Sequence, residues 1–270
     1  MEFNTRQYDG PYEVSAVELD IEGQLLRGLL YFPRESYPKP YPLITYFHDF
    51  PQLFSLHQIV SNLEFLLEMG FSLLVFNFRG YRQSQGEVSL QSQLQDALEM
   101  AKFIQLMGKK EIFKLKEVNI LAHGFGSYIA LLLSSMINFL NKILLISPIL
   151  NVKKQIDDDT FVKTLAYINR YLPGYIHGIE NTDLFLSKTK SELNCEEYRL
   201  ERVFNKMTYN KMKIIIGSRN KLIDISELKA SIFDKLPRLK VVLIEQMDHD
   251  WMDEENIGNL QEEIKLFLAY

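Results

Sequence analysis

Residues 118–130 constrain the fold more than any other part of the chain. They begin as a short apolar strand, pass through the turn Ala-His-Gly-Phe-Gly at 122–126, and continue as an apolar helix. A strand that runs straight into a helix strains the connecting residue and brings the two elements close, so the flanking residues must be small. Ala122 and Gly126 are small, and Gly124 tolerates a positive φ. The pattern predicts a strained strand–turn–helix at the carboxyl edge of a sheet. A plain turn whose glycines serve only packing is the alternative.

Further apolar runs of strand length occur before and after this turn, at 43–47, 72–78, 143–146, 213–216 and 240–244. The segment 90–104 between two of them has apolar residues at helical spacing. Such alternation predicts a mostly parallel sheet with right-handed crossovers. Residues 12–19 and 24–32 alternate like strands and flank Glu22-Gly23, which predicts an antiparallel hairpin at one sheet edge.

Taken in order, these runs and the motifs that follow them resemble the α/β-hydrolase family over residues 12–268. The closest resemblance is to its prolyl-oligopeptidase-like and serine-aminopeptidase-like branches. The resemblance implies an α/β-hydrolase fold: a mostly parallel sheet with the N-terminal hairpin and helices on both faces. It also implies one domain, 1–270, in which residues 149–211 are a helical cap whose aromatic residues could line a pocket.

The resemblance places a catalytic triad on three positions. The serine of the G-x-S-x-G turn corresponds to Gly124, which has no side chain to attack with. The acid corresponds to Asn220, whose amide orients and charges an imidazole less well than a carboxylate does. The histidine corresponds to His249 and is retained. We expect His249 to face the space above Gly124, with Asn220 within hydrogen-bond reach of it.

The resemblance also assigns residues around this triad. The family's His-Gly-x-Pro oxyanion loop corresponds to His48-Asp49-Phe50-Pro51, so that Asp49 replaces a glycine. The backbone N–H groups near Phe50 and of Phe125 are the expected oxyanion donors. His48 is expected to be a structural, hydrogen-bonded residue. A second family loop corresponds to the segment that contains Arg79 and Ser84, and its helix carries Asp96.

Substitutes for the lost groups are few. The carboxylates that could take the place of the acid are Asp224, Asp248 and Asp250, and the serines that could approach the site are Ser84, Ser127 and Ser147. We expect all six to have other roles. The histidines and acids have no metal-ligand spacing, and the glycines form neither a phosphate loop nor a dinucleotide fingerprint. No metal and no cofactor is therefore expected.

Two functions follow from this pattern. The first is a hydrolase-fold protein that has lost hydrolysis and binds a small molecule or a protein, with no turnover of p-nitrophenyl esters. A gap beside the oxyanion donors would then take a neutral or weakly polar ligand, since Asp49 would repel an anion unless Arg79 or Arg82 neutralised it. The alternative is an active esterase, thioesterase or peptidase with a rearranged site. A protein whose serine was replaced to trap a ligand is a third reading.

Composition excludes several other classes. The chain has 270 residues, 47% of them hydrophobic, and a formal charge of −5 without a basic block. Nucleic acid and anionic membrane are therefore not expected as main partners. The longest lipophilic stretch, 129–140, is too short to span a bilayer. Cys195 is the only cysteine and the N-terminus lacks a signal-peptide core, so we expect a cytoplasmic protein. The sequence does not determine the oligomeric state.

Overall fold

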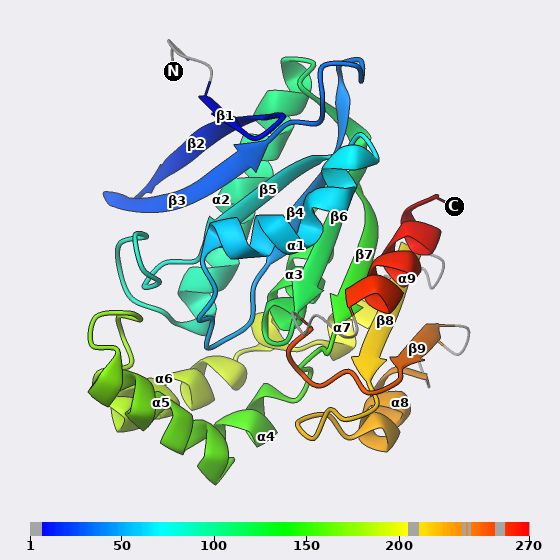
Figure 1. The fold of residues 1–270 in the computed structure, drawn as a ribbon. Coiled ribbons are helices and arrows are strands. Elements are labelled where there is room, and N and C mark those ends of the chain that lie inside the picture. The colour runs from blue at the N-terminus through cyan, green and yellow to red at the C-terminus, as the bar shows by residue number, and fades with distance from the viewer. Residues whose placement is uncertain (1–6, 205–210, 234–235, 237–238, 252–256, 270) are drawn as a thin grey trace.

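The computed structural model describes residues 7–204, 211–233, 236, 239–251 and 257–269. Nine strands form one sheet in the order β1-β2-β3-β5-β4-β6-β7-β8-β9 (Figure 1). From β5 onward all neighbours are parallel, whereas β1, β2, β3 and β5 pair antiparallel. The strands are β1 (Gln7–Asp9), β2 (Tyr12–Ile21), β3 (Gln24–Tyr31), β4 (Tyr41–Phe47), β5 (Ser72–Asn77), β6 (Phe113–His123), β7 (Leu140–Ile146), β8 (Met212–Gly217) and β9 (Lys240–Ile244). The expected fold class is confirmed.

The hairpin of β2 and β3 turns where the sequence predicts it. Glu22 and Gly23 have φ values of 56° and 82°, and Ile21 pairs with Gln24 across the turn. Two successive left-handed residues match the twist of the flanking strands, which favours this tight connection. The short edge strand β1, which pairs with β2, was not predicted.

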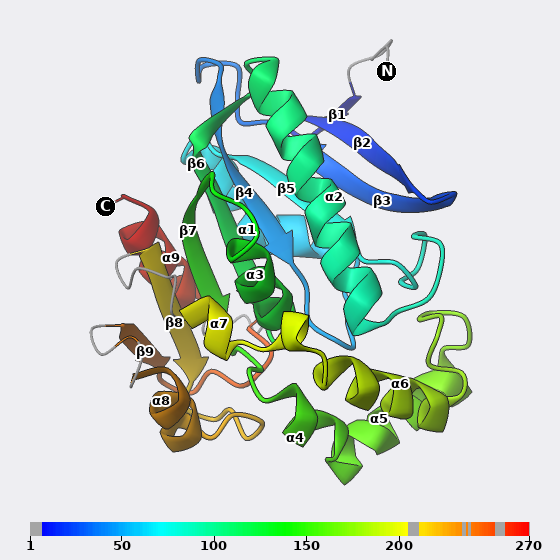
Figure 2. The same cartoon turned by 180° about the vertical axis from the view of Figure 1, so that it is seen from behind.

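Helices cover both faces of the sheet. On one face lie α1 (Leu56–Glu68) and α9 (Ile257–Ala269) (Figure 1), and on the other lie α2 (Leu90–Lys109) and α3 (Gly126–Ser134) (Figure 2). Alternate residues of β4 serve the two layers: Leu43 and Phe47 pack toward α2 and α3, and Ile44 and Tyr46 toward α1 and α9. The parallel strands are therefore apolar on both faces, as the continuous apolar runs predicted.

The segment between β7 and β8 contains α4 (Val152–Ile156), α5 (Asp159–Tyr171), α6 (Thr182–Leu193), the short 3₁₀ helix η1 (Glu196–Tyr198) and α7 (Glu201–Phe204), and α8 (Ile225–Phe233) follows β8. Helices α4, α5 and α6 lie beyond the carboxyl ends of the central strands (Figures 1 and 2). The Phe50 ring packs against Phe161 of α5 and Phe185 of α6, with centroid distances of 5.8 and 5.3 Å. The described part of the chain has no helix long and apolar enough to cross a membrane.

Candidate active site

The turn between β6 and α3 has the strained geometry that its sequence predicts. Gly124 has a φ of 50°, in the left-handed region that glycine adopts at little cost. Gly126 lies against the backbone of β4, where an added Cβ would come within 2.5 Å of two carbonyl oxygens. These contacts explain why glycine is needed at both positions. The turn therefore brings the backbone of Phe125 to the carboxyl edge of the sheet.

The space above Gly124 is filled by the side chain of Asp49. A Cβ atom built on Gly124 would lie 2.0 Å from Oδ1 of Asp49 and 2.1 Å from its Cγ. A serine hydroxyl is bonded directly to Cβ, so the Asp49 carboxylate occupies the place of a serine side chain at this turn. The expectation of a gap beside the oxyanion donors is therefore wrong. A glycine at position 49, as in the His-Gly-x-Pro loop, would have left this space empty. The Asp49 side chain fills it.

Asp49 also occupies the expected oxyanion donors. The N–H groups of Phe50 and Phe125 both donate to Asp49 Oδ1, at 2.7 and 2.6 Å. The two donors converge on one point, but they hold a carboxylate of the protein itself. A substrate carbonyl could use them only if the Asp49 side chain moved.

His249 contacts both Asp49 and Asn220. Its Nε2 lies 2.9 Å from Asp49 Oδ2, and its Nδ1 lies 3.2 Å from Asn220 Nδ2. Asn220 Oδ1 accepts from the N–H of Leu222 at 3.0 Å, which turns the amide NH₂ toward the ring. Nδ1 is then an acceptor, and Nε2 carries the proton that it donates to Asp49. A triad acid would fix the opposite tautomer, because it accepts a hydrogen bond from Nδ1–H.

His123 completes the group. Its Nε2 donates to the backbone carbonyl of His249 at 2.9 Å, and the two imidazole centroids are 5.1 Å apart. One ligand atom from each of Asp49, His123 and His249 lies within 4.8 Å of the others. Asp49 and His249 were expected at the site, but that His123 joins them was not predicted, because no spacing pattern connects three residues so far apart in the chain. The only signal was that each directly follows or ends a predicted strand, or lies in the final loop.

Burial and charge shift the pKa values of the three groups in different directions. Burial alone would raise the pKa of Asp49, but the hydrogen bond from His249 and its charge outweigh this and hold that pKa below its usual range. Burial opposes the charged form of His249, yet the Asp49 hydrogen bond and charge raise its pKa. Burial lowers the pKa of His123. Asp49 is therefore ionised at neutral pH, and the Nε2–H of its partner His249 donates to the buried carboxylate.

Arg79 and Arg82, which could have neutralised Asp49, contact other groups. Arg79 Nε pairs with the fully buried Asp96 at 2.5 Å, and the Arg82 guanidinium donates to the carbonyl of Leu53 at 2.5 Å. Ser84 also has a structural role, because its hydroxyl donates to Asn77 O and accepts from the N–H of Arg27. These contacts fix the loop after β5 against β3 and α2.

The remaining histidine and carboxylates also lie where structural roles explain them. His48 Nε2 accepts from the N–H of Phe78 at 3.1 Å, and its Nδ1 donates to the carbonyl of Asp49. Asp224 accepts from two N–H groups in the first turn of α8, and Asp248 accepts from the N–H of His249. The carboxylate on the imidazole is Asp49, which was not among the expected substitutes.

Among the three alternative serines, Ser127 Oγ lies 3.4 Å from the carbonyl of Ala122. Ser147 follows β7 with a φ of 46°, and its buried hydroxyl has no hydrogen-bond partner among the described residues. Ser147 is therefore the serine that an activity test has to control for.

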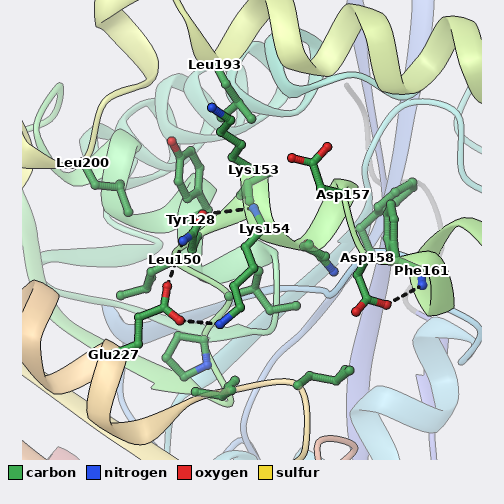
Figure 3. Close-up of a pocket in the computed structure, with 18 of the residues that line it drawn as sticks. Tyr128, Leu150, Lys153, Lys154, Asp157, Asp158, Phe161, Leu193, Leu200 and Glu227 are labelled. Atoms are coloured by element: carbon green, nitrogen blue, oxygen red, sulfur yellow. Dashed lines mark hydrogen bonds and ion pairs between the residues drawn. The ribbon is translucent and has the colours of Figure 1, made fainter.

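A cavity of about 1620 Å³ lies between α4, α5, η1 and α8 (Figure 3). Phe50, Pro51 and Tyr128 line it on the side of the sheet, and Phe161 lines it from α5. Two of its charged pairs are Lys154 with Glu227, at 2.5 Å, and Lys190 with Asp157, at 2.6 Å. The lining residues do not include Gly124, Asp49 or His249, so Phe50 is the link between the cavity and the polar cluster.

Few of the cap aromatic residues that could line a pocket line this cavity. Phe161 is part of it, whereas Tyr167 and Tyr171 are more than half exposed and contact each other with tilted rings. Phe185 packs under Phe50, and the Tyr175 hydroxyl donates to the carbonyl of Leu53 at 2.5 Å. Helix α5 is amphipathic, and its buried face carries Leu165 and Ile168 instead.

Solved structures of similar shape cover nearly the whole chain. Est1E from Butyrivibrio proteoclasticus with bound ferulic acid has a TM-score of 0.71 at 19% identity, over 94% of this chain and 98% of that one. The fold is that of the α/β-hydrolases. The Pyrococcus furiosus esterase Pf2001 has a TM-score of 0.67 at 17% identity, over 96% and 91% of the two chains. The Pyrobaculum calidifontis esterase has a TM-score of 0.66 at 16% identity, over 95% and 85%. No family model matches the sequence, and no curated protein matches it.

The expectation of a binding protein without hydrolytic machinery is contradicted. Two of these similar structures, Pf2001 and the Pyrobaculum calidifontis protein, are named as esterases. In this chain Asp49, His123 and His249 meet over Gly124, so the place of the serine holds polar groups that could act on a substrate. These findings favour the alternative, an esterase with a rearranged site.

Proposed function

We propose that this chain hydrolyses carboxylic esters at the Asp49–His249 pair, with water as the attacking group. One observation carries the proposal: the Asp49 carboxylate takes the place of the serine side chain and keeps the contact to the histidine that a serine would make. The site is therefore rebuilt around a different residue. Gly124 leaves no side chain that could form an acyl-enzyme at the turn.

The chemistry needs one proton to move twice. Asp49 Oδ2 takes a proton from the water while the oxygen of that water bonds to the ester carbonyl carbon. The Nε2–H of His249 keeps its hydrogen bond to Asp49 and holds the carboxylate in place. The bond to the alcohol then breaks, and the same proton goes to the leaving alkoxide. A positioned acid–base group of this kind contributes about 10²–10⁴ in rate. Because Asp49 Oδ1 holds the two backbone donors, we expect turnover about 10²-fold or more below that of an enzyme whose oxyanion hole is free.

The cavity beneath α4 and α5 is the proposed place for the acyl or alcohol group. Tyr128, Leu150 and Phe161 give it apolar walls (Figure 3), and its five basic and five acidic lining residues balance in formal charge. An anion would also lie near the ionised Asp49. A neutral or weakly polar ester is therefore the proposed substrate class.

The same proposal includes the wider organisation of the chain. In this proposal residues 1–270 form one domain, and residues 149–211 are a cap over the site. The protein descends from a serine hydrolase near the prolyl-oligopeptidase-like branch. The similarity of the strand order and the motif order supports this placement. A cytoplasmic location is part of the proposal because Cys195, the single cysteine, is a free thiol.

A panel of p-nitrophenyl esters from acetate to decanoate tests the function. We expect turnover above the buffer rate, with no serine labelled by a fluorophosphonate probe. The Ser147→Ala variant is the matched control, and it should keep the wild-type rate. Absence of turnover for the whole panel would refute ester hydrolysis. Labelling that disappears in Ser147→Ala would show that a serine attacks, and would refute the role given to water.

A further inference from the structure

We infer that Asp49, His123 and His249 form a binding site for a divalent transition-metal ion. One ligand atom from each residue lies within 4.8 Å of the other two, and the three residues are buried or half-buried at the edge of the sheet. Ligand atoms at about 2.0–2.2 Å from one tetrahedral ion lie about 3.3–3.6 Å from one another, so the three side chains need only small shifts to share an ion. Two imidazoles and one carboxylate suit zinc, cobalt or iron better than magnesium or calcium, which prefer oxygen ligands.

Nε2 of His123 already makes the kind of hydrogen bond that a metal-binding histidine makes with the ring nitrogen that is not bound to the ion. His123 Nε2 donates to the carbonyl of His249 at 2.9 Å, which leaves Nδ1 with the lone pair that an ion needs. A hydrogen bond from the other ring nitrogen to a backbone carbonyl fixes the tautomer and the ring orientation of a ligand. His123 is buried and has no part in the proposed proton transfer, so its Nδ1 is available to an ion without loss of that chemistry.

Asp49 is held in the same way. Its Oδ1 accepts the N–H groups of Phe50 and Phe125, which fixes the carboxylate, and its Oδ2 accepts from His249 Nε2–H, a hydrogen bond that a shared ion would replace. Three protein ligands leave a fourth position of a tetrahedral ion for water, which is the pattern of catalytic rather than structural zinc sites. A water bound there would ionise near neutral pH.

Asn220 opposes the ion in its present orientation. An ion on His249 Nε2 displaces the hydrogen bond to Asp49, and the ring proton must then reside on Nδ1. Asn220 presents its NH₂ group to Nδ1 and would have to turn its oxygen there, at the expense of the Leu222 N–H. A carboxylate at position 220 would accept from Nδ1 without this conflict. Asn220→Asp should therefore tighten metal binding.

This inference rests on the proposed ester hydrolysis only for the role of the site in catalysis. With an ion bound, Asp49 Oδ2 and His249 Nε2 would hold the ion, and the water on the ion would be the attacking group in place of a water activated by Asp49. Binding itself is measured without substrate. If an ion binds and no ester is hydrolysed, the site stands and the function fails. If esters are hydrolysed equally well after chelation and no ion binds, the function stands and the metal site fails.

The experiment is titration of the chelator-treated full chain with Zn²⁺ by calorimetry, in a Cys195→Ser background that removes the exposed thiol. We expect one equivalent to bind, an affinity loss of about 10–100-fold in His123→Ala, and a gain of about 10-fold or more in Asn220→Asp. His57→Ala, at an exposed histidine outside the cluster, is the matched control and should bind like the background protein. In the Co²⁺-loaded chain, the visible absorption should show a tetrahedral ion.

Two results would overturn the site. One is no Zn²⁺ binding to the folded background protein. The other is binding that His123→Ala and Asn220→Asp leave unchanged, which would place the ion on other side chains. If His123→Ala fails to fold, His123→Asn replaces it, and the Asn220→Asp comparison decides independently because that exchange is nearly isosteric.

Discussion

The Asp49 side chain occupies the space that a side chain at position 124 would need. The left-handed turn admits a side chain at residue 124 only with strain, and the carboxylate of Asp49 lies 2.0 Å from where Cβ would be. The sequence predicted Gly124, Asn220 and His249 as neighbours, and the contact between Asn220 and His249 agrees with that prediction. It predicted Asp49 beside the oxyanion donors, but it did not predict the contact of Asp49 with His249 or the part that His123 takes in the cluster. The direction of a loop side chain such as Asp49 depends on the backbone of the loop, which no periodicity specifies.

The shared space makes the two residues energetically coupled. Gly124→Ser alone should destabilise the fold by about 2–4 kcal/mol, because it overpacks the site and places an ordinary residue at positive φ. In an Asp49→Gly background the same change should cost at least about 1 kcal/mol less. Urea unfolding of the wild type, both single variants and the double variant measures this coupling. Additive costs would mean that the two side chains do not compete for one space.

At the scale of elements, the loop after β5 lies where the sequence predicted it, but its side chains make different contacts. The family motif predicted a loop with Arg79 and Ser84 near the site, and their contacts instead fasten it to α2 and β3. The apolar runs predicted the strands because continuous burial needs continuous apolar sequence. They could not predict β1, whose three residues are all exposed.

The buried ion pair of this loop should be important for stability. Arg79→Ala leaves the fully buried Asp96 carboxylate without its cation and should cost about 3–5 kcal/mol. Lys102→Ala removes an exposed pair with Glu99 and should change stability by less than about 1 kcal/mol. Guanidinium unfolding compares the two. Equal small effects would contradict the structural role given to Arg79.

At the scale of the whole molecule, the layer of α2 and α3 continues into the helices that follow β7. Leu165 and Ile168 of α5 and Phe185 of α6 belong to the same buried cluster as Leu43 and Phe47 of β4. Apolar contacts shared between these parts link their stability. The sequence predicted an insertion at this place because the strand–helix alternation stops there, but it could not predict which helix faces make the contact.

Continuity of this cluster predicts one cooperative unfolding transition. Leu165→Ala should destabilise the whole chain by about 2–5 kcal/mol, because Leu165 is fully buried and its loss leaves a cavity. Thermal unfolding followed by circular dichroism and by Trp251 fluorescence should give coincident curves in wild type and variant. A separate early transition, lowered by Leu165→Ala while the second stays unchanged, would show that the inserted helices unfold independently.

The most direct test of the central claim is kcat/KM for a short p-nitrophenyl ester in wild type, Asp49→Asn and His249→Ala, with His57→Ala as the control. Asn at position 49 keeps an oxygen for the N–H groups of Phe50 and Phe125 but cannot take a proton from water. We predict a fall of about 10²–10⁴ in Asp49→Asn and a comparable loss in His249→Ala, with His57→Ala at the wild-type value. Hydrolysis that Asp49→Asn leaves unchanged would contradict the claim that Asp49 has taken the place of the serine.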